Sequence, residues 1–329
     1  MSRPTRTTLA DVAAQAGVST SAVSLALNGH KGVSDETRAV ILQVAHDLGY
    51  RANPLAKALR SGRSGSYALL IRNLSNPYFL DVISAAQGEA HQSAATMLVV
   101  DSGYASEREH VERLADANVD GLAIAPIGMG AAVLQWQRLR PGTPIVVLNA
   151  ATAGLENVMR VSPDNESAVA QAVEHLAALG HRRVAFLTAP AKLMADHDRL
   201  TTFLAAAPAL GLEPVPVESR LSLDAVEEST VSLLSSEHPP SAVITNSDHT
   251  ASAVYRAAKS LGLQIGSDLS VVGHDDLPTS ELLDPPLTTL SLDRRAIGRA
   301  MFDRLSGAAR GNHLEAVHLV ARASTGQAL

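Results

Sequence analysis

The 329-residue sequence contains no cysteine, and aromatic residues make up only 3% of it. The absence of cysteine excludes disulfides, thiolate zinc sites, iron–sulfur clusters and cysteine nucleophiles. No uninterrupted apolar run approaches the roughly 20 residues that a membrane span requires. The first eight residues lead into no apolar stretch of the kind found in secretory signals. We therefore expect a cytoplasmic protein that has no membrane partner.

The charges are unevenly distributed along the chain. The net charge is −6, which argues against nucleic acid as a partner. Residues 1–63, however, contain eight Lys or Arg and four Asp or Glu, so this segment carries +4 and the remainder carries −10. A basic head on an acidic body is expected of a polyanion-binding module attached to another domain. An accidentally basic surface would give the same balance, so the interpretation depends on a motif.

The basic head has the pattern of three short helices. Thr8 and Asp11 predict a capping box for the first helix, which Gly17 ends. Ser19 caps a second helix that reaches Asn28-Gly29. Ser34 caps a third helix from Asp35 to Leu48, whose apolar stripe consists of Val40, Ile41, Val44, Ala45 and Leu48. Two short helices joined by a tight turn predict a helix-turn-helix.

The head resembles that of the lactose/galactose-repressor (LacI/GalR) family of transcription regulators. The matching segments are Thr8-Leu9-Ala10-Asp11-Val12-Ala13, Ala16-Gly17-Val18-Ser19, Val23-Ser24, Leu27-Asn28, Val33-Ser34-Asp35-Glu36-Thr37-Arg38 and Leu48-Gly49-Tyr50. Matches at so many fixed spacings make the resemblance specific. It implies a protein that reads a pseudo-palindromic operator in double-stranded DNA as a homodimer.

Residues 53–65 form the predicted hinge. Asn53 and Pro54 suit the N-cap and first turn of a helix that ends near Leu59, and a basic flexible connector follows. A helix of about seven residues is marginal in isolation. The resemblance implies that this hinge helix orders on DNA, pairs with its dimer mate and inserts Leu59 into the minor groove.

The rest of the chain alternates short apolar runs with helical segments. The strand-like runs are 67–71, 97–100, 121–125, 144–148, 184–187, 215–217, 242–244 and 269–272. The helical segments include 77–93, 106–117, 131–138 and 165–179, and Ser106 with Glu109 predicts a capping box. This alternation predicts parallel sheets covered by helices on both faces. Two such halves indicate two lobes, with ligands bound beyond the carboxyl ends of the strands.

This body resembles the periplasmic-binding-protein-like core of the same family. The matching segments are Val161-Ser162-Pro163-Asp164, Gly180-His181-Arg182-Arg183, Asp198-Arg199-Leu200, Val271-Val272-Gly273-His274-Asp275-Asp276 and Pro285-Pro286-Leu287-Thr288-Thr289-Leu290. We predict a helix-turn-helix domain over 1–52, a hinge over 53–65 and an effector-binding and dimerisation domain over 66–329. Lobe 1 would take about 66–180 and 294–310, and lobe 2 about 183–290 and 315–329, with crossings near 180–183, 290–294 and 310–315.

The resemblance assigns DNA contacts to the start of the second helix. Thr20 and Ser21 would read base edges, helped by Ser24, while Ala22 and Leu25 could offer only apolar contact, for instance to a thymine methyl. Leu25 stands where many members of the family have a long polar residue. We therefore expect sequence specificity to depend more on DNA shape. The remaining expected DNA contacts, mostly to phosphates apart from the Leu59 wedge, are Thr8, Ser19, Asn28, Lys57 and Leu59.

The resemblance also implies a small-molecule effector between the lobes, a sugar, sugar phosphate or nucleoside. Arg199 would be the forked donor, and Asp164, Asp248 and Asp275 would accept from ligand hydroxyls. Tyr78 and Phe79 would offer an apolar wall. Any one of these carboxylates could equally be a helix N-cap or a surface residue.

Other chemistries find less support. Gly128-Met129-Gly130 follows a strand as a dinucleotide fingerprint would, but Val133 occupies its third small position. His197 and His274 stand beside acidic residues without the pattern of a metal site. We expect no cofactor, metal or catalytic residue, and a repressor rather than an enzyme. A solute-binding protein or an α/β enzyme with a vestigial head is the alternative.

Overall fold

The computed structural model describes residues 7–27, 29, 31–50, 62–103, 106–128, 130–190, 197–220 and 222–328. These residues form two compact units that divide after Ser64. We call residues up to Ser64 the head and residues 65–329 the body, and each is described by itself. The predicted hinge helix at 53–59 lies outside the described residues.

The head contains the three predicted helices, α1 (Leu9–Ala16), α2 (Thr20–Leu27) and α3 (Asp35–Asp47). The capping box of Thr8 and Asp11 is confirmed, and Gly17 ends α1 in the left-handed conformation with φ of 65°. Ser34 caps α3 by accepting from the amide of Thr37. Short polar caps thus define the helix ends, as the sequence predicts.

One small apolar core holds the three head helices together. Its fully buried members are Val12, Ala13, Val23, Ala26, Ile41 and Ala45. Two members of the predicted stripe on α3 were placed wrongly, because Val40 and Leu48 are exposed in the described head. Only the face of α3 that carries Ile41 and Ala45 is buried against α1 and α2.

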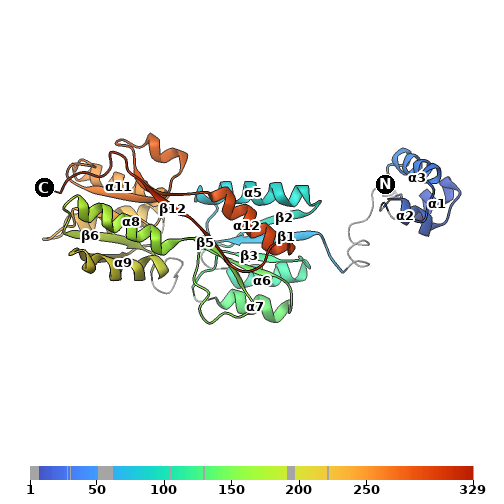
Figure 1. Cartoon of the computed structure of the whole chain (residues 1–329), viewed down its shortest axis with the longest axis horizontal. Helices are drawn as coiled ribbons and strands as arrows, with labels where there is room; N and C mark the ends of the chain where they lie inside the picture. Colours follow the sequence, from blue (N-terminus) through green and yellow to red (C-terminus); the bar gives the residue numbers. More distant parts are fainter. Residues whose placement is uncertain are drawn as a thin grey trace, which may run out of the picture. The chain divides into compact units, whose positions relative to one another are not determined.

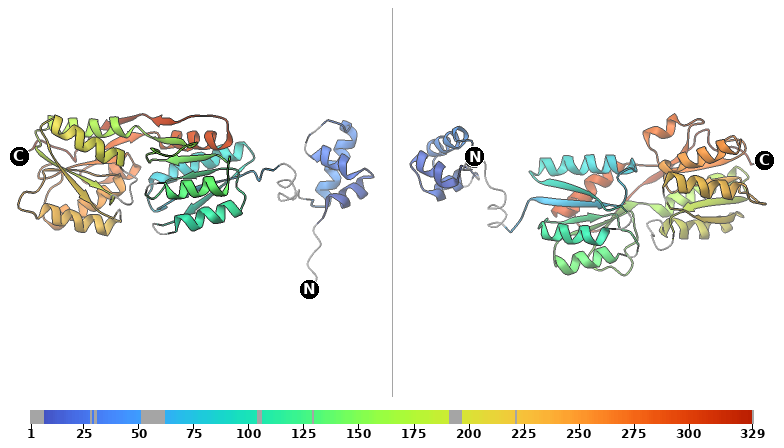
Figure 2. Two further views of the ribbon diagram at one scale, coloured as in Figure 1. Left: turned by 90° about the horizontal axis from the view of Figure 1, so that it is seen from below. Right: turned by 180° about the vertical axis from the view of Figure 1, so that it is seen from behind.

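The body consists of two α/β lobes, each with a six-stranded sheet covered by helices on both faces (Figures 1 and 2). The sheet of lobe 1 has the order β11-β5-β4-β3-β1-β2 and is parallel throughout. The elements of lobe 1 are β1 (Ser66–Ile71), α5 (Tyr78–Gln92), β2 (Thr96–Asp101), α6 (Glu107–Asp116), β3 (Leu122–Ile124), α7 (Ala131–Leu139), β4 (Ile145–Leu148), β5 (Met159–Pro163), α12 (Arg294–Ser306) and β11 (His313–Glu315).

Lobe 2 repeats this order as β12-β10-β9-β8-β6-β7, and only the pair of β10 with β12 is antiparallel. Its elements are α8 (Asn165–Ala178), β6 (Arg183–Thr188), α9 (His197–Ala209), β7 (Glu213–Glu218), α10 (Leu223–Leu234), β8 (Ala242–Ile244), α11 (Asp248–Ser260), β9 (Ser270–Asp275), the 3-10 helix η2 (Pro278–Leu282), β10 (Thr288–Leu292) and β12 (Val317–Val320). The predicted two-lobed core with parallel sheets is therefore confirmed.

The chain crosses between the lobes between β5 and α8, between β10 and α12, and between β11 and β12. The first crossing was predicted near 180–183, and this is wrong because α8 packs in lobe 2 (Figure 1). Gln171 of α8 donates from its amide to the carbonyl of Val317 and accepts from the amide of Leu319, both on β12. The first crossing therefore lies at Pro163–Asp164.

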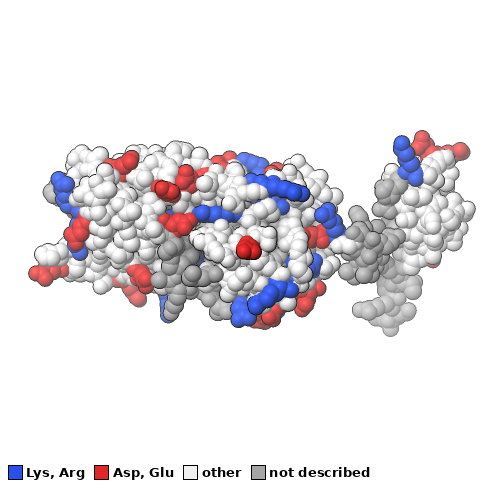
Figure 3. All heavy atoms as spheres, turned by 60° about the horizontal axis from the view of Figure 1, so that its bottom comes forward, with Lys and Arg blue, Asp and Glu red and all other residues white. Residues whose placement is uncertain are grey.

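The predicted capping box of α6 is also wrong. Ser106 precedes the helix, but its side chain makes no cap hydrogen bond. The amphipathic pattern alone places this helix, because Val111 and Leu114 bury one face against lobe 1. Acidic and basic side chains are interspersed over the body surface in Figure 3.

Candidate functional sites in the head and the cleft

In the head, α2 buries one face and presents the other. Val23 and Ala26 are buried, whereas Thr20 and Ser21 at the start of the helix are exposed. Ala22, Ser24 and Leu25 are half-buried. A helix with an exposed polar first turn can enter a major groove while its other face stays packed.

The cap residues of the head use their hydroxyls within the fold. Ser19 accepts from the amide of Ala22 at 3.2 Å. The backbone amide of Thr8 donates to the carboxylate of Asp11 at 2.7 Å and its hydroxyl donates at 2.8 Å, and these two hydrogen bonds lower the pKa of Asp11. Leu25 lies against the turn at Gly32, where a Cβ atom would come within 3.3 Å of Leu25 Cδ1. Asn28, Lys57 and Leu59 lie outside the described residues.

The cleft between the lobes contains a cavity of about 40 Å3 that residues from both lobes line. Its lining residues are Arg72, Asn76, Tyr78, Phe79, Asn149, Arg199, Asn246, Ser247 and Asp275. A neighbouring cavity of similar size shares five of these residues and adds Asn73, His249 and Thr250. Most of these side chains follow the carboxyl ends of parallel strands, which is where open α/β sheets bind ligands.

The lobe 1 wall of this cavity is aromatic. The rings of Tyr78 and Phe79 pack edge to face, with centroids 5.1 Å apart. The Tyr78 hydroxyl donates to Asn149 Oδ1 at 3.2 Å. Burial, and next the nearby charge of Asp275, raise the pKa of Tyr78. Tyr78 is therefore a neutral hydrogen-bonding group at physiological pH.

The lobe 2 wall carries two charged residues, Arg199 and Asp275, and Arg72 adds a third charge from lobe 1. Arg199 is only 8% exposed; its Nε donates to Asn165 Oδ1 at 2.8 Å and its Nη1 donates to the carbonyl of Asn246 at 2.7 Å. Asp275 ends β9 with φ of 117°, and one of its oxygens lies 3.0 Å from His274 Nδ1. A residue other than glycine in this region of φ is strained, and such strain concentrates at functional sites.

Arg294 holds this strained segment to lobe 1. Its guanidinium donates to the backbone carbonyls of Asp275 and Asp276 in lobe 2. The same side chain donates to the carboxylate of Asp81 on α5 at 3.0 Å. One arginine therefore bridges the end of β9 to the helix that carries Tyr78 and Phe79.

Asp248 does not line the cleft cavity, contrary to the prediction. Its carboxylate is buried and accepts from the amide of Leu277 and from the hydroxyls of Ser280 and Thr289, at 2.8, 2.5 and 2.5 Å. Burial, and next the charge of Asp275, raise its pKa to about 6. These three donors make Asp248 a structural anchor for the loop that follows β9.

Gly273 lets the Asp248 carboxylate lie against the backbone of β9. A Cβ atom at position 273 would come within 2.1 Å of Asp248 Oδ1. No side chain fits in that space, so a glycine is required by this close approach rather than by a turn.

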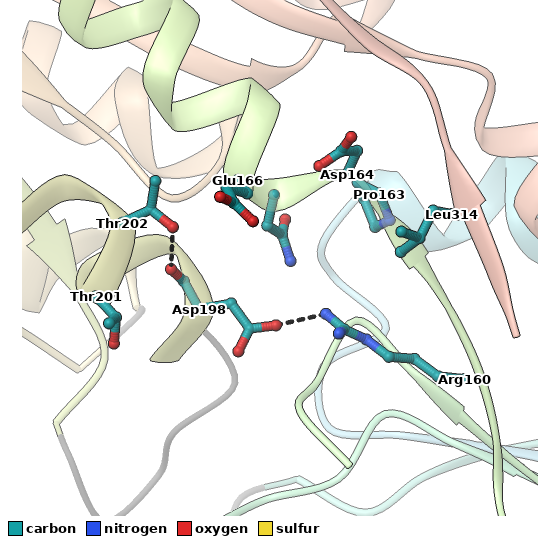
Figure 4. Close-up of a pocket in the computed structure, with 9 residues that line it drawn as sticks. Arg160, Pro163, Asp164, Glu166, Asp198, Thr201, Thr202 and Leu314 are labelled. Carbon is teal, nitrogen blue, oxygen red and sulfur yellow. Dashed lines mark hydrogen bonds and ion pairs between the residues drawn. The ribbon is translucent and has the colours of Figure 1, made fainter. Parts of the chain in front are cut away.

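Asp164 also lies outside the cleft cavity. It caps α8 by accepting from the amide of Ser167 at 3.1 Å. Together with its neighbours, Asp164 lines a separate pocket of about 460 Å3 at the first crossing (Figure 4). There Arg160 of β5 pairs with Asp198 of α9 at 2.5 Å, which joins the two lobes. The sequence offered the helix-capping role for this carboxylate as an alternative, and the structure has that role.

Five polar residues of the cavity were not predicted as site residues. Just beyond β1, β4 and β8 stand Arg72, Asn149, Asn246 and Ser247, and Asn76 precedes α5. The signal was available, because residues at the carboxyl ends of strands converge at one edge of a sheet.

Within the described ranges, no three His, Cys, Asp or Glu side chains come together in a way that could hold a metal ion. His274 is buried beside Asp275. None of the helices in the described part of the chain is long and apolar enough to cross a membrane.

Comparison with known proteins agrees with this architecture. Residues 8–53 match the family model of bacterial regulatory proteins of the lacI family, and residues 173–325 match the periplasmic binding protein-like domain. The HTH-type transcriptional regulator MalR of Streptomyces coelicolor is 33% identical over 98% of this chain and 97% of its own length. The HTH-type transcriptional repressor CytR of Escherichia coli K12 is 28% identical over 98% of this chain and 97% of its own.

The fold is similar to the crystal structure of the Lac repressor dimer bound to operator and the anti-inducer ONPF. The TM-score is 0.87 at 28% identity, over 98% of this chain and 99% of that one. The family similarity thus extends over both the head and the body. This chain belongs to the lacI family of bacterial regulatory proteins, and it is a helix-turn-helix DNA-binding transcriptional regulator rather than an enzyme.

Proposed function

We propose that this protein is a homodimeric, cytoplasmic repressor whose affinity for operator DNA is set by a small polyol, sugar-like or nucleoside-like, bound between the lobes. The observation that carries this proposal is the cavity that both lobes line, with Arg199 and Asp275 opposite the ring of Tyr78. A forked donor, an acceptor and a flat apolar wall are what a hydroxylated ligand with one apolar face requires.

The proposed DNA interface is the exposed start of α2. Thr20 and Ser21 would contact base edges, and the half-buried Ala22, Ser24 and Leu25 would follow along the groove. Thr8, Ser19, Asn28 and Lys57 would contact phosphates, and Leu59 would enter the minor groove. These roles rest on the family resemblance, with the domain boundaries 1–52, 53–65 and 66–329.

Ligand entry requires the lobes to move. A cavity of about 40 Å3 is far below the roughly 300–1,000 Å3 of typical ligand pockets. Tyr78 and Phe79 lie on α5, which packs along α12, and Arg294 ties α5 to the end of β9. A ligand that separates or reorients the lobes would therefore shift α5 relative to β9, and this is the proposed coupling to the hinge.

Apolar side chains on the body surface support a dimer. Leu80 on α5 is 59% exposed and Leu282 on η2 is 81% exposed. Contiguous apolar patches mark surfaces that another protein covers, and these two leucines would belong to such a surface in the proposed dimer. The similar Lac repressor structure is that of a dimer. Two heads on one dimer would match the two halves of a pseudo-palindrome.

The test starts from a duplex selected from a random library with the full chain. We expect binding to this duplex to exceed binding to random DNA and to fall steeply with salt. A body that begins at Gly65 should lose DNA binding and keep ligand binding. A full chain with no preference for any duplex contradicts the proposal.

A thermal-shift screen with sugars, sugar phosphates and nucleosides identifies the ligand class. Arg199→Ala should abolish the response of DNA binding to the ligand and leave the affinity for the duplex intact. Arg113→Ala is the control, because Arg113 lies on α6 outside the cleft and its side chain is exposed. An unchanged ligand response in Arg199→Ala removes Arg199 from the site.

A further inference from the structure

Resting on the function proposed above, a narrower inference concerns the chemical class of the ligand. We propose that the ligand carries an oxyanion, a phosphate or a carboxylate, and that Arg72 binds it together with Arg199. Arg72 follows β1 in lobe 1, and Arg199 lies on α9 in lobe 2. Both line the same cavity. An anion between them would contact both lobes at once.

Both guanidinium groups are held by uncharged oxygens. Arg199 donates to the side-chain oxygen of Asn165 and to a backbone carbonyl. Arg72 donates from Nη1 to the carbonyl of Pro126 at 3.2 Å. Among the described residues, neither arginine forms an ion pair with a carboxylate. No direct ion pair therefore compensates either charge, and each guanidinium has further N–H donors, since it has five.

Three other buried or half-buried arginines of the body, Arg294, Arg304 and Arg322, are bound within the fold. Arg294 pairs with Asp81, and Arg322 pairs with Asp276. Arg304 has no acidic partner in the described chain, but all three of its nitrogens donate to backbone carbonyls. Arg72 and Arg199 differ from these residues in having donors to spare at a cavity. Forked donors with spare N–H groups bind phosphate and carboxylate in a bidentate manner.

The charge balance of the cavity supports an anion. Asp275 is the one carboxylate among its lining residues. Glu107 lies near Arg72 but accepts from the amide of Ile127, and burial raises its pKa to about 7, so it neutralises Arg72 only in part. Burial lowers the pKa of His249 in the neighbouring cavity, which keeps that ring neutral. Two guanidinium groups thus face one carboxylate in a poorly solvated site.

Asp275 would bind a different part of the ligand from the two arginines. A carboxylate accepts hydrogen bonds from hydroxyls and repels an oxyanion, so it suits the polyol part of the ligand. Neutral sugars and nucleosides have no group that takes two guanidinium forks. The lining residues therefore favour a sugar phosphate or a sugar acid over both.

Inorganic phosphate is the minimal probe for the full-length protein. At constant ionic strength, exchange of chloride for phosphate should raise the melting temperature in a saturable way. Arg72→Gln and Arg199→Gln should each weaken this phosphate binding by roughly tenfold to a hundredfold, the range for loss of a charge-assisted hydrogen bond. Arg72→Lys, which keeps the charge and loses the fork, should fall between. Arg113→Gln on α6 should respond like the wild type.

Organic probes separate the two sources of the anion. Glucose 6-phosphate, gluconate and glucose are compared in the same assay, and a phosphate ligand predicts a response to the first and a carboxylate ligand a response to the second. Equal stabilisation of wild type and Arg72→Gln by phosphate overturns the inference, as does no stabilisation by any anion. If a neutral sugar or nucleoside binds wild type and Arg72→Gln alike, the inference fails and the proposed function stands. Loss of duplex preference in the full chain would instead remove the proposed function.

Discussion

The two lobes have the same strand order, yet their interiors differ in polarity. In lobe 2, buried Ser247 caps α11 by accepting from the amide of Thr250, and the buried carboxylate of Asp248 accepts from Leu277 and Ser280 in a neighbouring segment. In lobe 1 the corresponding helix, α7, begins with Ala131 and packs Trp136 into an apolar cluster. The indole Nε1 of Trp136 has no hydrogen-bond partner among the described residues. Shared topology therefore does not fix the chemistry of the interior.

The buried polar network of lobe 2 lies beside the loop that follows the binding residue Asp275. Asp248 accepts hydrogen bonds from Leu277 and Ser280, which lie in the loop between β9 and β10, and from Thr289 on β10. This loop follows Asp275, the carboxylate of the cleft. The buried network thus positions a binding residue, whereas the apolar cluster of lobe 1 supports α7 away from the cleft. Variants in the two lobes test this difference in polarity.

The largest expected effect is that of Asp248→Ala. Loss of the carboxylate leaves three buried donors without an acceptor, so we expect the free energy of unfolding to fall by about 3–5 kcal/mol. Urea unfolding of the body measures this change. Asp224→Ala, at an exposed carboxylate in the first turn of α10, is the control and should change stability little. A loss below about 1 kcal/mol for Asp248→Ala would contradict its role as an anchor.

Glu107→Gln tests the buried carboxyl group of lobe 1. Burial raises the pKa of Glu107 from 4.5 to about 7, so the folded state binds the proton more tightly than the unfolded state. The contribution to stability is therefore full below about pH 4.5 and is lost as the pH rises through 7.

The glutamine variant keeps a neutral side chain at every pH. We expect it to match the wild type at pH 5 and to be more stable at pH 8.5 by roughly 2–3 kcal/mol. Urea titrations across this pH range measure the difference. The pKa of about 6 for Asp248 adds a slope of the same sign in lobe 2, and this slope should persist in the Glu107→Gln variant. A pH-independent gain would assign the effect to packing.

Arg294→Met tests the connection between the lobes. The variant removes the donors to the carbonyls of Asp275 and Asp276, both of which have positive φ. We expect amide hydrogen exchange over residues 275–277 to accelerate by about tenfold or more, because a charged donor contributes about 1.5–3 kcal/mol. Arg299→Met is the control on the same helix, since Arg299 pairs with Asp293 at the surface. Unchanged exchange would show that the remaining contacts, those of Arg322 with Asp276 and of Asp248 with Leu277, hold this segment without Arg294.

The smallest effect compares two corresponding helix caps. Ser222 caps α10 in lobe 2 by accepting from the amide of Ala225, whereas Ser106 makes no such bond at α6 in lobe 1. Ser222→Ala should lower the free energy of unfolding by about 1 kcal/mol, and Ser106→Ala should leave it nearly unchanged. Thermal unfolding of the two variants side by side is the measurement. Equal losses would contradict the difference between the caps.

Local signals were sufficient for the head. The bonds of Thr8, Ser19 and Ser34 each span three residues, so a short stretch of sequence contains both partners. The strands of the body were likewise visible as apolar runs, because parallel strands are buried on both faces. Strands near the C-terminus, such as β11 and β12, were missed because they are short and half-exposed edges.

The carboxylates of the body could not be assigned in the same way. Asp248, Asp164 and Asp275 each lie at the end of a strand or helix. The local sequence does not show which of them contacts a ligand and which caps a helix. Their roles depend on partners far along the chain, such as Thr289 for Asp248, 41 residues away. Whether a carboxylate faces a cavity or closes a network is decided by tertiary packing, which a single sequence does not display.

The three crossings have a consequence for synthesis on the ribosome. Strand β5 pairs with β11, which follows it by about 150 residues, and β10 pairs with β12 near the C-terminus. Neither lobe can complete its sheet until its last strand, β11 or β12, has left the exit tunnel. The head has no such dependence, because its apolar core consists of its own residues. A nascent chain therefore carries a finished head on an unfinished body until these two edge strands emerge.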